Sequence, residues 1–314
     1  MNTQDPSDRP GAGRPASDAD DRRGEVHKAF EVQLGAASHQ GHVREKNEDH
    51  YLVMSFGRSL NNLLTNLDEG VLEPSYCSTG YGMLVADGIG GMAAGEVASH
   101  WALTKLVELL VETPDWIMRL ERTEDVTIIL QRMTQRFLKI DETLKEKARW
   151  DATLRGMGTT LTVACTLRND LIIGHVGDSR AYLLRDGRLQ QLTTDHTLAQ
   201  SLIDAGIAAR DDPASRSMRH VLTAALGSLG KRIEPQVQHL KVHQGDQLLL
   251  CTDGLTEMVE DKILAEALFE ATSAQTACES LVDLALSGGG IDNITVVIHR
   301  FGPFSSGTNE LRSV

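Results

Sequence analysis

The sequence lacks the cysteine arrangements that hold zinc or support redox chemistry. Its four cysteines lie far apart and form no C-x-x-C pair: Cys77, Cys165, Cys251 and Cys278. Two of them fall within apolar strand patterns, which predicts buried free thiols. Because free thiols are typical of reducing compartments, we expect a cytoplasmic protein.

Long apolar runs and an excess of basic residues are also missing. No run approaches the length of about 18 residues that a membrane helix needs, and the polar N-terminal segment does not resemble a signal peptide. The 31 lysines and arginines are outnumbered by 44 aspartates and glutamates, which gives a formal net charge of −13. Nucleic acids and anionic membranes are bound by clustered basic side chains, so we expect neither as a partner.

Several catalytic signatures are absent as well. Neither G-x-x-x-x-G-K-[ST] nor G-x-G-x-x-G occurs, which excludes P-loop and Rossmann sites, and no cysteine begins the C-x₅-R pattern of cysteine-based phosphatases. Ser179 lacks the G-x-S-x-G setting of an esterase nucleophile. The histidines, including His175 and His196, form no H-x-H or H-E-x-x-H motif, and we expect packing or surface roles for them.

The domain organisation follows from length and composition. The chain has 314 residues, of which 41% are hydrophobic, enough for one large domain with tails. Residues 1–28 are polar and rich in Asp, Arg, Pro, Gly and Ser, which predicts a disordered tail before a domain at 29–302 and a short tail at 303–314. Apolar patterning breaks down at about 195–237, where we expect a flap, and at 58–80, where we expect an irregular insertion.

The apolar periodicity predicts an α+β fold. Residues 102–110 and 126–144 repeat at helical spacing, typical of helices that simply cover a core. From Thr159 the period becomes two, with turns at Asn169-Asp170 and Asp186-Gly187, which predicts an antiparallel meander. Antiparallel strands with separate helix blocks favour layered α+β architecture over alternating βαβ units.

Three aspartates stand at the ends of apolar strands. Residues 83–86 lead into Asp87-Gly88, residues 248–252 lead into Asp253-Gly254, and Asp292 precedes the strand at 294–298. A single Asp-Gly pair is most often a turn, but several carboxylates near a core would repel one another unless a divalent cation lay between them. Oxygen ligands suit Mg²⁺ or Mn²⁺ better than zinc, so the pattern indicates metal-assisted hydrolysis.

A charged segment precedes the strand at 51–54. It reads Arg44-Glu45-Lys46-Asn47-Glu48-Asp49. In an extended chain Arg44 and Glu48 lie on the same face. Arg44 would then bind a phosphate while Glu48 interacts with the ligands around the metal. A run of charged side chains that simply face the solvent explains the same residues equally well.

Polar residues interrupt another strand at Gly177-Asp178-Ser179-Arg180. We interpret Asp178 and Arg180 as a buried ion pair that braces a loop.

Six blocks together resemble the metal-dependent serine/threonine protein phosphatases of type 2C, especially their bacterial branch. In chain order they are residues 44–49 (REKNED), 85–91 (VADGIGG), 156–160 (GMGTT), 176–180 (VGDSR), 251–255 (CTDGL) and 292–295 (DNIT). The likeness covers about residues 33–299. It implies a four-layer αββα sandwich with two central antiparallel β-sheets and a two-metal site at one edge.

The resemblance also implies roles for individual residues. Asp87 would bridge two Mn²⁺ or Mg²⁺ ions, the Gly88 carbonyl would bind one of them, and Asp253 and Asp292 would complete the protein ligands. Glu48 and Asp49 would act through metal-bound waters, and Arg44 would hold the substrate phosphate. A metal-activated water would attack phosphorus in line, without a phospho-enzyme.

Two positions depart from the family pattern. Ile89 stands where eukaryotic members have a histidine, which leaves the leaving-group acid unassigned. Many members bind a third metal through an acidic residue just before the G-x-G-T-T block, whereas this chain has Arg155 there. Asp151 is nearby, but the sequence does not assign it.

The expected activity is hydrolysis of phosphoserine and phosphothreonine on proteins, opposing a bacterial serine/threonine kinase, by a monomeric enzyme. The alternative is a catalytically silent regulatory module that binds phosphoproteins with the same fold; the complete ligand set argues against it. A two-metal phosphodiesterase or nuclease is disfavoured by the net charge and by the absence of histidine ligands.

Overall fold

The computed structural model describes residues 31–64, 66–68, 71, 75–90, 94–113, 123–209, 212, 215, 217–228 and 232–302. The expected tails at 1–28 and 303–314 lie outside these residues. Across the described ranges, no helix combines the length and the apolar character that a membrane crossing requires.

Two five-stranded antiparallel sheets form the centre of the molecule. The first sheet has the order β1 (Val32–His39), β12 (Ile294–Phe301), β11 (Gln247–Cys251), β8 (Arg180–Arg185) and β9 (Arg188–Gln191). The second has the order β10 (Gln236–Lys241), β7 (Asp170–Val176), β6 (Leu161–Leu167), β3 (Ser75–Ala86) and β2 (His50–Asn61). A small ladder joins β4 (Gly88–Ile89) to β5 (Gly158–Thr159).

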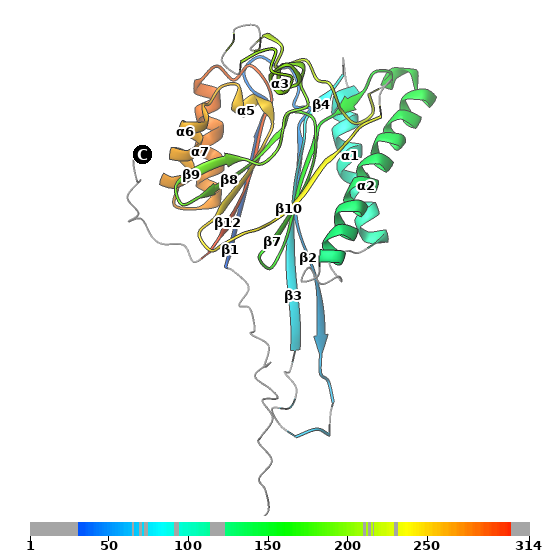
Figure 1. The fold of residues 1–314 in the computed structure, drawn as a ribbon, viewed down its shortest axis with the longest axis vertical. Coiled ribbons are helices and arrows are strands. Elements are labelled where there is room, and N and C mark those ends of the chain that lie inside the picture. The colour runs from blue at the N-terminus through cyan, green and yellow to red at the C-terminus, as the bar shows by residue number, and fades with distance from the viewer. Residues whose placement is uncertain are drawn as a thin grey trace, which may run out of the picture.

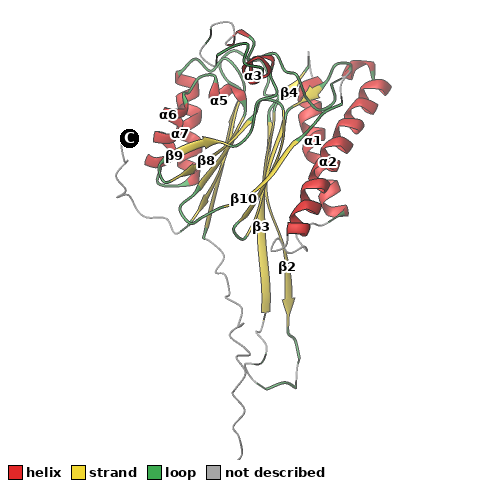
Figure 2. Cartoon of the chain, in the orientation of Figure 1, coloured by secondary structure: helices red, strands yellow, loops and turns green. Residues whose placement is uncertain are grey.

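Helices cover the outer face of each sheet (Figure 1). The long helices α1 (Ala94–Glu112) and α2 (Thr123–Trp150) pack on the second sheet. The short α5 (Asp253–Thr256), α6 (Asp261–Glu270) and α7 (Ala274–Ser287) pack on the first. Figure 2 shows the resulting order of helix, strand, strand and helix layers, so the predicted four-layer αββα sandwich is confirmed.

Alternating side chains of the core strands serve two different layers. In β3, Leu84 points toward α1 and α2, whereas its neighbours Met83 and Val85 lie between the sheets. There they meet Leu248 and Leu250 of β11. Each fully buried side chain of this kind contributes about 1.5–3 kcal/mol, so the layer between the sheets holds the sandwich together.

The predicted helical stripe is confirmed in α2. Met133, Phe137, Ile140 and Leu144 recur every three or four residues and are all buried. The acidic residues of the first turn and the basic residues of the last turn complement the helix dipole.

The predicted meander needs one correction. Both hairpins form, β6 with β7 and β8 with β9; the second turns at Asp186-Gly187 as expected, and the first turns at Arg168-Asn169, one residue before the expected position. They belong to different sheets, because the chain crosses between Val176 and Arg180. Gly177 makes this crossing with φ +114°, a backbone conformation that favours glycine. Period-two patterning identifies strands but does not say which sheet they join.

The prediction of an irregular insertion at 58–80 is also wrong for those of its residues that the structure describes. Strands β2 and β3 pair continuously from His50 opposite Ala86 to Asn61 opposite Ser75. The two strands therefore form a long hairpin that extends beyond the rest of the sandwich (Figure 1). Residues 65, 69, 70 and 72–74 of the connecting loop lie outside the described residues.

Three cysteines are free thiols in the structure. Cys251 and Cys278 are buried, and Cys165 is partly buried. The prediction of free thiols is confirmed for these three.

In the expected flap, α3 (Leu198–Asp204) begins with Thr197 as its N-cap. An isolated bridge between Thr159 and Leu226 attaches the segment to the body, and a second bridge, between Thr197 and Leu222, lies within the segment.

Candidate functional site

Carboxylates from both sheets converge at one end of the sandwich. Asp87 follows β3 of the second sheet, and Asp253 follows β11 of the first. With Asp178, which stands just before β8, they form a group in which one carboxylate oxygen from each residue lies within 4.8 Å of the other two. Two strand ends that the sequence singles out therefore meet in space.

Asp178 is the member of this group that sequence reasoning missed. The expected pair between Asp178 and Arg180 is wrong, because Arg180 donates instead to both carboxylate oxygens of Asp195, with Nη2 2.6 Å from Oδ2. Its Nη1 also donates to the Tyr182 hydroxyl. The local signal for Asp178 was Gly177, whose positive φ lets the chain turn between sheets immediately before the carboxylate.

Burial and mutual repulsion disfavour the charged forms of these carboxylates. Burial, followed by the neighbouring carboxylates, raises the pKa of Asp87 and Asp178 well above the ordinary value. Burial first, then the nearby charges of Glu257 and Asp292, raises the pKa of Asp253 to about 7. Such groups require either protons or a cation to coexist.

The donor set fits a hard divalent cation. Oδ1 of Asp253 and Oδ1 of Asp49 are buried and have no hydrogen-bond partner among the described residues. Unsatisfied carboxylate oxygens in a buried position are costly, and a metal ion would satisfy them. All ligand atoms of the group around Asp87 are oxygens, as Mg²⁺ and Mn²⁺ prefer.

Asp49 lies close to the carboxylate group of Asp87, Asp178 and Asp253. The Thr252 hydroxyl donates to its Oδ2 at 2.8 Å, and the Thr295 amide donates to the same hydroxyl at 3.0 Å. Burial raises the pKa of Asp49 to about 7 despite these contacts. The carboxylate is thus fixed by the strand ends of the first sheet.

Gly88 and Gly95 let helix α1 approach β4 closely. A Cβ on Gly88 would clash with the backbone of Gly95, and a Cβ on Gly95 would lie 2.8 Å from the Glu48 carboxylate. Burial raises the pKa of Glu48, and the positive charge of Arg44 partly opposes that rise. The Glu48 side chain therefore lies over the start of α1, within electrostatic reach of Arg44.

The segment that carries Arg44 is bent and not extended as expected. Bends occur at residues 42–43 and 45–46, so strand alternation is not what places Arg44 near Glu48. Arg44 Nη2 donates to Oδ2 of Asp292 at 2.5 Å, and the Arg44 side chain remains 54% exposed. This bond, together with the charges of Asp87 and Asp253, raises the pKa of Arg44. The guanidinium stands at the rim of the carboxylate cluster.

Asn293 holds this bent segment in place. Its Nδ2 donates to the carbonyls of Gln40 and Lys46, each at 2.8 Å, and its Oδ1 accepts from the Glu48 amide at 2.8 Å. The side chain is 5% exposed. Asn293 was part of a motif, but only the structure shows that it positions the Arg44 segment.

Two threonines fix the backbone of Asp87. The Asp87 amide donates to the Thr160 hydroxyl at 2.9 Å, and the Asp87 carbonyl accepts from the Thr159 hydroxyl at 2.8 Å. The Thr160 hydroxyl also lies 2.7 Å from that of Ser179, which is fully buried. Residues of the GMGTT block therefore hold the backbone of Asp87 in place through hydrogen bonds.

The positions that depart from the family pattern offer no ligand. Ile89 pairs with Gly158 in the small ladder, and Arg155 is exposed at the end of a short 3₁₀ turn at Ala152–Leu154. Asp151 caps that turn, because its Oδ1 accepts from the Thr153 amide and hydroxyl at 2.9 and 2.6 Å.

His175 is buried among polar neighbours and not poised for chemistry. Its Nδ1 lies 2.9 Å from the Thr162 hydroxyl, and its ring stacks on His196 with centroids 5.1 Å apart. Burial lowers the pKa of His175 to about 3. The expected packing role is confirmed for this pair.

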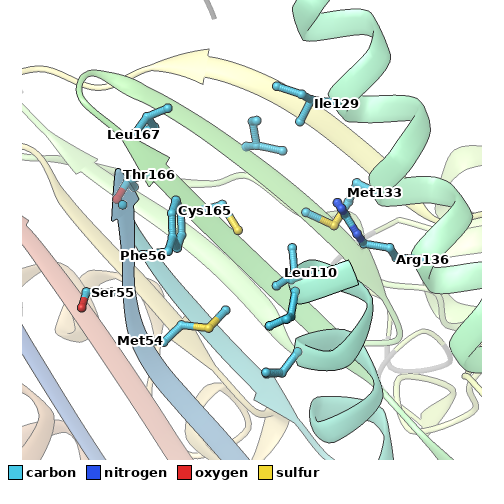
Figure 3. A pocket seen from close by; sticks show the side chains of 14 residues that line it. Met54, Ser55, Phe56, Leu110, Ile129, Met133, Arg136, Cys165, Thr166 and Leu167 are labelled. Carbon is cyan, nitrogen blue, oxygen red and sulfur yellow. The ribbon is translucent and has the colours of Figure 1, made fainter. Parts of the chain in front are cut away.

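An apolar cavity of about 330 Å³ lies between the helices and the second sheet (Figure 3). Met54 and Cys165 line it from the strands, and Leu110 and Met133 line it from α1 and α2. None of the clustered carboxylates lines it, so this cavity is separate from the carboxylate group.

Comparisons with known proteins agree with this geometry. A family profile described as "Protein phosphatase 2C" matches residues 77–286. The serine/threonine protein phosphatase PstP of Mycobacterium tuberculosis is 37% identical over 216 residues, which is 69% of this chain but 39% of that relative. The serine/threonine phosphatase stp of Listeria innocua is 35% identical over the same length, covering 82% of the relative.

Solved structures show the same fold. The catalytic domain of PstP in complex with two manganese ions aligns with a TM-score of 0.65 and 32% sequence identity, covering 86% of this chain and 97% of that one.

Proposed function

This chain belongs to the protein phosphatase 2C family, and on that premise we propose that it hydrolyses phosphoserine and phosphothreonine on proteins with the help of two Mn²⁺ or Mg²⁺ ions. The observation that carries the proposal is the convergence of buried carboxylates from both sheets, with the Arg44 guanidinium at their rim. The manganese-bound structure of a relative supports the choice of metal.

In this proposal Asp87, the Gly88 carbonyl, Asp253 and Asp292 hold the ions. Glu48 and Asp49 support them through water. When bound, the two ions would activate a water for in-line attack on phosphorus and offset the negative charge of the phosphate. Asp178 adds a further carboxylate to the same group.

Arg44 binds the substrate phosphate. Its guanidinium is half-exposed and can present two parallel N–H groups to phosphate oxygens. Ile89 has no proton to give, so the leaving alkoxide is not protonated by the residue after Asp87-Gly88.

The substrates we propose are phosphorylated proteins, which the names of the relatives support. The enzyme would oppose a serine/threonine kinase and act as a monomer in the cytoplasm, where the free thiols of Cys251 and Cys278 would remain reduced.

The silent regulatory module remains the competing function. Such a module has no need of a complete ligand set. Asp87, Asp253 and Asp292 are all present in this chain, which favours catalysis.

The test is metal-dependent turnover. The full chain should hydrolyse para-nitrophenyl phosphate and a phosphothreonine peptide with Mn²⁺, and EDTA or Asp253→Asn should abolish both reactions. Asp283→Asn on the exposed face of α7 is the matched control and should leave turnover unchanged. Activity that survives both EDTA and Asp253→Asn would refute the two-metal mechanism. A folded wild-type chain that binds Mn²⁺ without turning over either substrate would establish the silent module.

A further inference from the structure

A second group of potential metal ligands shares Asp253 with the first. One ring nitrogen of His220, one carboxylate oxygen of Asp253 and one of Glu257 lie within 4.8 Å of one another. His220 Nδ1 is 2.6 Å from Glu257 Oε1. Glu257 follows Asp253 by four residues across α5, so both carboxylates lie on the same side of that short helix.

Asp253 contributes an oxygen to this group as well as to the first. Its Oδ1 is buried and has no hydrogen-bond partner among the residues that the structure describes. The other two ligands satisfy each other, but they leave this oxygen unpaired. The Asp253 carboxylate, shared by the two groups, would bridge a cation between these three residues and the two-metal centre.

The flap fixes where His220 stands. Two residues after it, Leu222 bridges Thr197, and the Leu198 amide donates to the Val221 carbonyl at 2.7 Å. The His220 side chain is nevertheless 62% exposed, whereas that of Glu257 is 20% exposed. An ion can therefore reach the group from solvent while the backbone holds the imidazole in place.

We propose that His220, Asp253 and Glu257 form a third metal position, which takes Mn²⁺ or another transition-metal dication in preference to Mg²⁺. An imidazole and two carboxylates make a mixed nitrogen and oxygen set, which suits transition metals, whereas Mg²⁺ prefers oxygen ligands alone. The inference rests on the proposed function in so far as Asp253 also serves the two-metal centre.

This position differs from the third-metal position that the family resemblance implies. That position needs an acidic residue just before Gly156, where this chain has an exposed Arg155. Asp151 does not replace it, because its Oδ1 caps a turn. The histidine and Glu257 supply ligands from the flap and from the end of α5 instead, so metal binding would tie the flap to the first sheet.

Metal stoichiometry tests the proposal. The metal-free full chain is dialysed against Mn²⁺ or Mg²⁺, and the bound metal is counted per folded chain, with circular dichroism as the check on folding. The wild type should bind three Mn²⁺ but two Mg²⁺. His220→Ala and Glu257→Gln should each bind two Mn²⁺, with the affinity for the third lowered at least tenfold.

The matched control is His243→Ala. His243 is an exposed histidine before β11, at the opposite end of that strand from Asp253. This variant should retain all three Mn²⁺. Loss of the third ion from His243→Ala as well, or its retention in His220→Ala, would overturn the proposal.

The stoichiometry also separates this inference from the proposed function. Two Mn²⁺ in the wild type, with turnover of the phosphothreonine peptide, would refute the third position and leave the phosphatase intact. Three Mn²⁺ that depend on His220, without turnover, would establish the position and refute the phosphatase.

Discussion

Arg44 and Asp292 form an ion pair at the rim of the carboxylate site, with Nη2 of Arg44 2.5 Å from Oδ2 of Asp292. The residue proposed to bind phosphate is therefore paired with one proposed to bind metal. A cation on Asp292 would compete with Arg44 for that carboxylate and leave the guanidinium available to the substrate. The pair thus couples metal binding to phosphate binding through one carboxylate.

We expect Arg44→Ala to raise KM for a phosphothreonine peptide about 10- to 100-fold, because a charge-assisted hydrogen bond contributes about 1.5–3 kcal/mol. The affinity for Mn²⁺ should not fall, since Asp292 loses a competing partner. Steady-state kinetics and metal titration measure the two effects. Arg188→Ala on the exposed β8–β9 hairpin is the control, and an unchanged KM in Arg44→Ala would remove Arg44 from the phosphate site.

The carboxylate cluster should make metal-free stability depend on pH. The pKa of Asp49 and Asp253 is about 7 in the folded chain, against an ordinary value of 3.8. The folded state therefore binds more protons, and the stability this provides is fully present below about pH 4 and lost as the pH rises through about 7.

It follows that Asp253→Asn should stabilise the metal-free chain at about pH 7.5, by up to about 4 kcal/mol, while it abolishes turnover. At about pH 4 the two proteins should differ little. Urea unfolding in EDTA at both pH values measures the effect, with Asp283→Asn as the control. A variant that is less stable than the wild type at both pH values would contradict the argument.

Asn293→Ala should loosen the Arg44 segment. The substitution removes three hydrogen bonds to Gln40, Lys46 and Glu48 and leaves buried backbone groups unpaired. We expect a loss of about 2–4 kcal/mol in the free energy of unfolding and a higher KM. Asn169→Ala, at an exposed hairpin turn, should change stability by less than about 0.5 kcal/mol. Equal stability losses in the two variants would show that the amide of Asn293 does not hold the segment.

Gly177→Ala should cost more stability than Gly187→Ala. Both glycines have positive φ, +114° and +74°. A Cβ on Gly177 would lie 2.6 Å from the Thr160 side chain that supports Asp87, whereas a Cβ on Gly187 would meet nothing within 4 Å. We expect about 1–2 kcal/mol for Gly187→Ala, from backbone strain alone, and a clearly larger loss with weaker Mn²⁺ binding for Gly177→Ala. Thermal unfolding and metal titration decide between them.

Local patterns were sufficient for much of the fold. The stripe of α2 and the two hairpin turns depend on neighbours within a few residues, and the structure confirms them, with the first turn one residue earlier than Asn169-Asp170. The long β2–β3 hairpin was missed because the outer residues of β2 are exposed and show no apolar alternation.

Long-range pairing limited what could be predicted of the site. Asp87 and Asp253 were visible because each ends an apolar strand. Asp178 was assigned to Arg180, two residues away, although the partner of Arg180 is Asp195 across the β8–β9 hairpin. His220 carried no motif, and its contact with Glu257 joins two residues that are far apart in the sequence.

The pairing of β1 with β12 bears on how the protein is made. Val32–His39 is an edge strand, and its hydrogen-bonding neighbour is Ile294–Phe301. During synthesis β1 leaves the ribosome long before its partner has been translated, so it must wait unpaired while the second sheet assembles. Asp292 lies two residues before β12. A nascent or truncated chain that has not reached it would therefore lack both a closed first sheet and a complete set of proposed metal ligands.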